Sequence, residues 1–196
     1  MLPGDTFISY RADRKVRHPV TKEHFGYLIL NTGLLQVLAT QESTSTAIIT
    51  TAFTAVNRKD FVSQYTAEPM PLTSGSKPID RFAPATGKLP GYIVETLNGA
   101  YGVQEACILG SDDVVYLDLG SNNGVLPGDT FIIYRPVPII QGNYDKFWFE
   151  KNKEVFAPLV VAGELTVFRV HEKSSTAVVT RSFKPFFIGS KVELRE

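Results

Sequence analysis

The sequence contains two versions of one pattern, and this repetition limits the possible folds more than any other feature. LPGDTFISYR at positions 2–11 recurs as LPGDTFIIYR at 126–135, with nine of ten residues identical. A second block at 33–53 aligns without gaps on 163–183. The first block recurs at an offset of 124 residues and the second at 130, so the later copy carries about six extra residues between them. Two blocks in the same order indicate an internal duplication.

Each copy has the residue pattern of β-strands. Leu35 and Val37, then Ala47 and Ile49, alternate with polar or small residues, which is typical of half-buried strands. The polar runs TQEST and HEKSS supply hairpin turns in the first and second copy, and the Pro-Gly pairs of both LPGD blocks mark tight turns. No segment has the spacing of an amphipathic helix. We therefore expect an all-β fold of two duplicated small barrels of the Src-homology-3 type.

A proline-rich stretch separates the two copies. Residues 66–90 contain five prolines and the run SGS, a composition typical of linkers. The sequence thus predicts a first barrel copy at 1–66, a linker at 67–88 and a second, complete copy at 89–196.

The first copy is short at its N-terminal end. About 36 residues precede the LPGD block of the second copy, whereas only Met1 precedes that of the first. Either the natural chain begins further upstream, which we favour, or strands from elsewhere complete the first copy. We therefore expect an open edge along the strand Thr6–Tyr10. It would pair with a neighbouring protomer, giving self-association, or with a segment of the linker between Pro69 and Pro90.

Composition excludes several kinds of partner. Lysine plus arginine and aspartate plus glutamate both total 20, so the net charge is zero. Nucleic acids and anionic membranes attract clustered positive charge, and we expect neither as a partner. The sequence contains no run of about 18 apolar residues, the length that a membrane-spanning helix needs. The single cysteine, Cys107, excludes an internal disulfide and lies in an apolar run typical of a buried, inert thiol.

The sequence offers no set of residues for catalysis or metal binding. His18 and His24 lie in a predicted loop and His171 in a predicted turn, without the spacing of a zinc site. Nucleophile-elbow, Walker and dinucleotide-binding motifs are absent from the sequence. Asp5 and Asp129 each follow Pro-Gly, where a carboxylate accepts backbone N–H groups within the turn. We expect a protein that is not an enzyme and that holds no cofactor or metal.

One loop of the second copy departs from the repeat. Residues 139–156 are rich in aromatic side chains and include the only tryptophan. A packing role, in which this hairpin caps the barrel or lies on the first copy, is the simpler interpretation. The alternative is a contact surface for a protein or glycan partner. Its candidate contact residues are Tyr144, Phe147, Trp148 and Phe149.

The second copy also resembles a known family. DDVVYLDLGSNNGVLPGDTFIIYRP and the later GELTVFRVHEKSSTAVVTRSFKPFFIGSKVEL resemble the C-terminal region of bacterial LysM-containing envelope proteins. RHPVTKEHFGYLI in the first copy is similar to the His-Pro-Val-Thr loop of that family, and the C-terminal domain of flagellar assembly protein T has a similar barrel pattern. The shared motifs are turn glycines and strand residues, which specify a fold better than an activity. This sequence contains no LysM repeat, so LysM glycan binding is carried over to no residue.

The resemblance implies a function outside catalysis. It points to a structural or interaction module of a bacterial cell-envelope protein, periplasmic or extracellular, that accompanies a peptidoglycan-binding LysM segment outside this chain. Its partner would be a protein or a component of the cell wall. The alternative is a module that binds cell-wall glycan or peptide through the aromatic loop 139–156.

Overall fold

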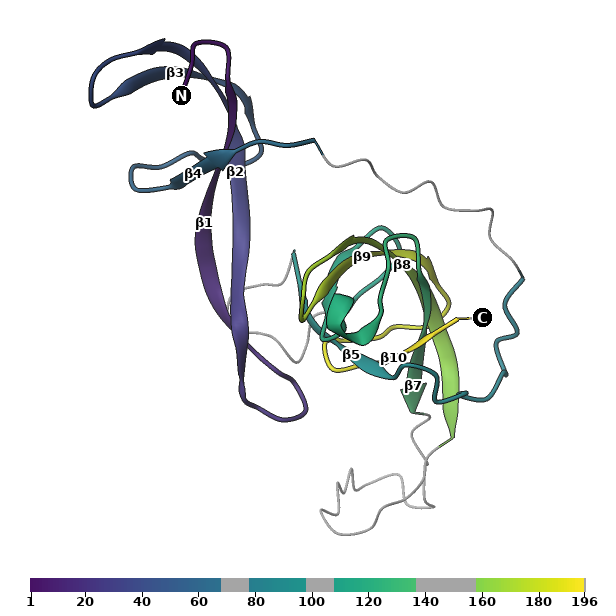
Figure 1. Ribbon diagram of the computed structural model, residues 1–196. Helices are drawn as coiled ribbons and strands as arrows, with labels where there is room; N and C mark the ends of the chain where they lie inside the picture. Colours follow the sequence, from purple (N-terminus) through teal and green to yellow (C-terminus); the bar gives the residue numbers. More distant parts are fainter. Residues whose placement is uncertain (68–77, 98–107, 137–157, 196) are drawn as a thin grey trace. The chain divides into compact units, whose positions relative to one another are not determined.

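The computed structural model describes residues 1–67, 78–97, 108–136 and 158–195, which form strands and one short 3-10 helix (Figure 1). The all-β prediction is confirmed. The chain divides into two compact units, the first made of Met1–Arg17 and Glu23–Met70 and the second of His18–Lys22 and Pro71–Glu196.

The first unit is an open sheet of four antiparallel strands in the order β3-β2-β1-β4. These are β1 (Thr6–Arg17), β2 (His24–Thr40), β3 (Ser45–Ala52) and β4 (Phe61–Gln64). The first unit is therefore a sheet, and the expectation of a barrel in this half of the chain is wrong.

The strand β1 lies in the middle of this sheet. Phe7 pairs with Leu35 of β2 on one side and with Gln64 of β4 on the other, and Tyr10 pairs with Phe61. The expected open edge at Thr6–Tyr10 is thus wrong, because the chain returns after β3 and lays β4 against β1. Within the described residues, the outer strands of this sheet are β3 and β4.

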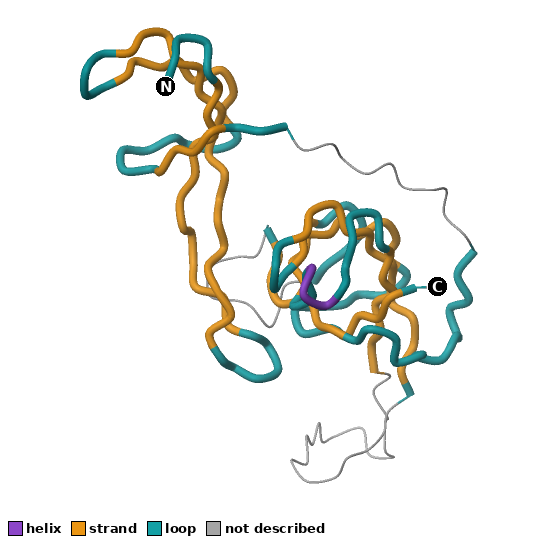
Figure 2. The backbone as a smooth tube through the Cα atoms, in the orientation of Figure 1, coloured by secondary structure: helices purple, strands orange, loops and turns teal. Residues whose placement is uncertain are grey.

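The second unit is a closed barrel of six strands in the order β10-β5-β6-β9-β8-β7. Figure 2 shows these strands curving into a ring, and in this view the 3-10 helix η1 (Ser121–Asn123) lies within the outline of that ring. The strands are β5 (Gly91–Thr96), β6 (Val114–Leu117), β7 (Thr130–Pro136), β8 (Leu159–Val170), β9 (Ser175–Ser182) and β10 (Lys191–Leu194).

Four strands of the barrel are paired as the four strands of the open sheet are. Leu35 faces Ile49 across β2 and β3, and Leu165 faces Val179 at the same place across β8 and β9. The bulges also correspond, since the register shifts after Val37 in the sheet and after Val167 in the barrel. The segments STSTAIIT and SSTAVVT both contribute a strand, as expected.

The tight turns before β1 and β7 also match. Gly4 has φ 95° and Gly128 has φ 97°, a backbone conformation that glycine adopts without strain. The Asp5 carboxylate accepts the Leu2 N–H at 2.8 Å, and the Asp129 carboxylate accepts the Leu126 N–H at 2.9 Å. The expected turn role of the two aspartates is confirmed.

The described part of the proline-rich segment, residues 78–88, lies along the outside of the barrel. Ile79 and Ala85 pack against a cluster that includes Tyr134 on β7 and Val161 on β8. The Tyr134 hydroxyl donates to the Pro84 carbonyl at 3.4 Å. These residues therefore belong to the second unit.

Candidate interaction surface

The interior of the barrel is filled by apolar side chains from alternate positions of its strands. Successive side chains of a strand point to opposite faces, so every second residue faces the core. Within the described residues, fifteen buried apolar side chains form this core. Those whose counterparts on the open sheet are also apolar are fully buried, with 0 % exposure: Phe131, Leu165, Val167, Ala177, Val179 and Val192.

The corresponding positions of the first unit form an apolar face that is open to solvent. We call this set the open face; it consists of Phe7, Leu35, Val37, Ala47, Ile49 and Val62. Exposure rises from the middle of the sheet to its edges. Val37 on β2 is buried, whereas Ile49 on β3 is 49 % exposed and Val62 on β4 is 47 % exposed. Their barrel counterparts, Val179 and Val192, are fully buried.

The edges beside the open face are unpaired within the described residues. In the barrel, β9 pairs with β6 along Ser175–Val178, and β10 pairs with β5 at Lys191 and Val192. The corresponding outer sides of the first unit are Ser45–Ile48 on β3 and Phe61–Val62 on β4. Solvent-exposed edges of this kind are templates for the addition of another strand. The open face thus lies between two edges that can each accept a strand.

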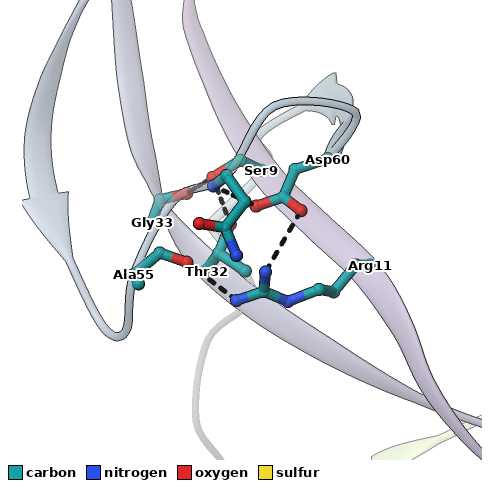
Figure 3. A network of polar contacts seen from close by, with 7 residues as sticks. Ser9, Arg11, Thr32, Gly33, Ala55 and Asp60 are labelled. Atoms are coloured by element: carbon teal, nitrogen blue, oxygen red, sulfur yellow. Dashed lines mark hydrogen bonds and ion pairs between the residues drawn. The ribbon is translucent and has the colours of Figure 1, made fainter.

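A polar network holds the middle of the open sheet together (Figure 3). Ser9 Oγ on β1 lies 2.7 Å from Thr32 Oγ1 on β2, and both side chains are buried. Arg11 donates to the Ala55 carbonyl at 2.7 Å and forms an ion pair with Asp60 at 3.5 Å. These contacts connect β1 and β2 to the loop that leads into β4. They therefore help to hold β4 in place as an outer strand of the open sheet.

Two buried carboxylates of the barrel, Glu193 and Glu164, are occupied by structural contacts. Glu193 on β10 accepts the Gly87 N–H at 2.9 Å and the Lys191 ammonium at 2.7 Å. Burial alone would raise the pKa of Glu193, but the hydrogen bonds from Lys191 and Gly87 outweigh burial and lower the pKa below its ordinary value. Glu164 on β8 forms ion pairs with Arg181 and Arg195. Neither carboxylate has the unengaged oxygen that acid–base chemistry requires.

A depression of about 240 Å³ lies beside Glu193, between the barrel and the packed segment 78–86. Tyr134 lines it, and burial together with the nearby Glu193 carboxylate raises the pKa of the Tyr134 phenol. A phenol with a raised pKa stays protonated at neutral pH, so it acts there as a hydrogen-bond donor to Pro84. Among the lining residues, the Thr86 hydroxyl donates to the Glu193 carboxylate at 3.5 Å.

Some of the residues singled out from the sequence lie outside the part of the chain that the structure describes. Tyr144, Phe147, Trp148 and Phe149 lie outside the described residues, as does Cys107, so the aromatic contact surface stays a prediction.

The histidines contact separate partners. In the second unit, His18 Nε2 lies 3.0 Å from Asp118 Oδ2, while in the first unit the His24 ring packs edge-on against Tyr27. His171 is exposed in the turn between β8 and β9. Across the described residues, no three or more His, Cys, Asp or Glu side chains are grouped to hold a metal ion.

Sequence reasoning missed the open face. The pattern of Ala47 and Ile49 correctly indicated a strand, but its expected half-burial is wrong, because every residue of β3 is exposed. The strand Phe61–Gln64 was not recognised. The available signal was the alignment of Val62 with Val192 at the same offset of 130 residues as the second repeat block.

Comparisons with known protein families and with curated proteins find no match. Among the described residues, no helix is long and apolar enough to cross a membrane. The function is therefore inferred from the geometry of the two units.

Proposed function

We propose that this chain is a non-catalytic assembly module that binds a partner polypeptide through the open face of its first unit. The observation that carries the proposal is the half-exposed state of Ile49 and Val62, at positions where the barrel buries its side chains completely. Removing the remaining exposed surface of these two side chains from water would contribute on the order of 1 kcal/mol each. Phe7 and Leu35, which are partly exposed, would add to this gain.

The proposal includes an origin for the two units. We infer that both derive from one duplicated barrel of the Src-homology-3 type, joined by the proline-rich segment 67–88. The matched strand pairing, the matched bulges and the shared turn geometry of Asp5 and Asp129 support this origin. In the first unit, the duplicated element retains four strands among the described residues.

The cellular setting rests on the family resemblance. The chain would belong to a bacterial cell-envelope protein and would accompany a LysM segment that binds peptidoglycan. Zero net charge favours a polypeptide partner over a nucleic acid. The engaged state of Glu164 and Glu193 supports a role without catalysis.

Photo-crosslinking tests the binding surface. A benzophenone amino acid replaces Ile49 or Val62 in the cells that naturally make the protein, and Lys173 in the exposed β8–β9 turn serves as the control position. We expect a covalent adduct of defined mass from positions 49 and 62 and none from 173. Absence of adducts from both face positions in folded protein would contradict the proposal. Cell fractionation tests the proposed location in the cell envelope. Recovery of the protein with the cytosol would contradict that location.

A further inference from the structure

We propose that the open face is filled by a partner segment that adds two antiparallel strands between β3 and β4 and closes the first unit into a six-stranded barrel. This inference rests on the proposed function and names the structure of the partner. It follows from the barrel of the second unit, which shows what covers the same face when it is closed.

Two strands complete the barrel. There β5 pairs with β10, β6 pairs with β9, and β5 pairs with β6, so this strand pair bridges the edges of a four-stranded arrangement. The first unit has the counterparts of β10 and β9 as its outer strands, β4 and β3. A single added strand would satisfy one edge and leave most of the open face exposed. A pair is the smallest addition that reaches both edges.

The barrel also specifies the register of the incoming strands. Val114 to Leu117 of β6 pair with Val178 to Ser175, positions that correspond to Ile48 to Ser45 of the first unit. The strand that lies along β3 would therefore span four residues. Its neighbour would pair with Phe61 and Val62, as β5 pairs with Lys191 and Val192.

The side chains of the incoming strands follow from the same positions. Ile93 on β5 and Val115 and Leu117 on β6 are fully buried in the barrel core. The partner must therefore carry branched apolar residues at two alternate positions of the strand beside β3 and at one position of the strand beside β4, facing Ile49 and Val62. Main-chain hydrogen bonds to the two edges would supply affinity, and these alternate side chains would supply specificity.

A second copy of this chain fits the open face less well. Its own β5 and β6 are paired within its barrel, and lending them would expose Ile93, Val115 and Leu117 to water. Pairing β3 of one copy with β3 of another would cover one edge of each sheet and leave the open faces uncovered. The geometry therefore favours a partner with its own strand pair over self-association.

A chimera tests the closure directly. A second copy of residues 90–125 is fused to the N-terminal side of Leu2 in the full chain and replaces Met1, so that the junction reproduces the natural order before Leu126. The control chimera carries Val115→Asp and Leu117→Asp in the added segment only. The readouts are hydrogen exchange of β3 and β4, and photo-crosslinking from position 49.

We expect exchange in β3 and β4 to slow at least tenfold in the chimera and to stay unchanged in the control. The adduct from position 49 should disappear in the chimera, because the added strands occupy the face, and should persist in the control. Unchanged exchange in the chimera, or an undiminished adduct, would overturn the two-strand partner. A dimer of the unmodified chain that already protects β3 and β4 would also overturn it, in favour of a second copy. The proposed function fails on a different result, the absence of any adduct from the unmodified chain.

Discussion

The two units share the pairing of four strands but differ at the outer strands. In the second unit, β5 and β6 connect β10 to β9, and the interior is sealed. In the first unit, β4 and β3 are the outer strands of an open sheet, and their apolar residues Val62 and Ile49 remain about half exposed to solvent. The alternation of apolar and polar residues along a strand thus determines which face of the sheet is apolar. Closure of the sheet into a barrel determines whether that face is buried from solvent. A repeated pattern can therefore serve as a core in one copy and as a binding surface in the other.

The largest difference should come from introducing a charge at equivalent positions. Val179→Asp would bury a carboxylate in the barrel core and should destabilise the second unit by more than about 4 kcal/mol. Ile49→Asp, at a half-exposed site, should cost the first unit about 1 kcal/mol or less. Urea titration followed by hydrogen exchange of β9 and β3 measures the two effects. Equal losses at the two positions would show that the open face is covered in solution.

A second difference concerns Glu193, whose position in the first unit is occupied by Ser63. Glu193→Ala leaves the Gly87 N–H without its acceptor and should destabilise the barrel by about 1–3 kcal/mol. The pKa of Glu193 is lower in the folded barrel than in the unfolded chain. Its contribution is therefore complete above the unfolded pKa and is lost as the pH falls through the folded pKa.

Glu193→Gln should accordingly flatten the loss of barrel stability in acid. Urea titrations of the wild type and the variant between pH 7 and about pH 3 measure this slope. Glu42→Gln, in the exposed β2–β3 turn, is the matched control and should leave the slope unchanged. Identical slopes for Glu193→Gln and the wild type would contradict the lowered pKa of Glu193 in the folded barrel.

The buried pair Ser9 and Thr32 should show a third, smaller difference. The barrel has Ile133 and Ala162 at these positions. Ser9→Ala alone leaves the Thr32 hydroxyl without its side-chain partner and should cost about 1 kcal/mol. Ser9→Ile with Thr32→Ala installs the barrel pair and should recover most of that loss. A double-mutant cycle on the first unit measures the coupling, and purely additive costs would contradict it.

The smallest expected effect lies in the turn before β4. Lys59 has φ 76°, and its counterpart in the barrel is Gly189 with φ 92°. Lys59→Gly should relieve backbone strain and stabilise the first unit by about 0.5 kcal/mol, after the entropy that glycine loses on folding. Gly128→Ala, at φ 97°, should act in the opposite direction on the barrel. A lower melting temperature for Lys59→Gly would contradict the prediction that the backbone at Lys59 is strained.

Much of the local structure could be predicted from the sequence. The alternation of Ala47 and Ile49 indicated a strand, and Pro-Gly-Asp indicated a turn whose carboxylate caps a backbone N–H. Both features depend on neighbours within a few residues, so they can be recognised from a short stretch of sequence. The strand at Phe61–Gln64 was missed because four residues are too few to show a period.

The candidate surface was harder to predict. The open edge was expected at Thr6–Tyr10, since nothing in the sequence revealed that β4 would return to pair with that strand. The aromatic residues Tyr144, Phe147, Trp148 and Phe149 drew attention through composition, whereas the open face consists of ordinary core residues. Such residues signal a surface only when the structure leaves them uncovered.

The sequence by itself determined most of the strands, the tight turns and the alternation of apolar residues along the two repeat blocks. Only the tertiary structure decided that Val179 is buried and Ile49 is half exposed, although the two residues occupy the same place in the same pattern. The physical reason is that burial depends on strands brought in from distant parts of the chain. For Val179 those strands are β5 and β6, and for Ile49 the described residues supply no equivalent.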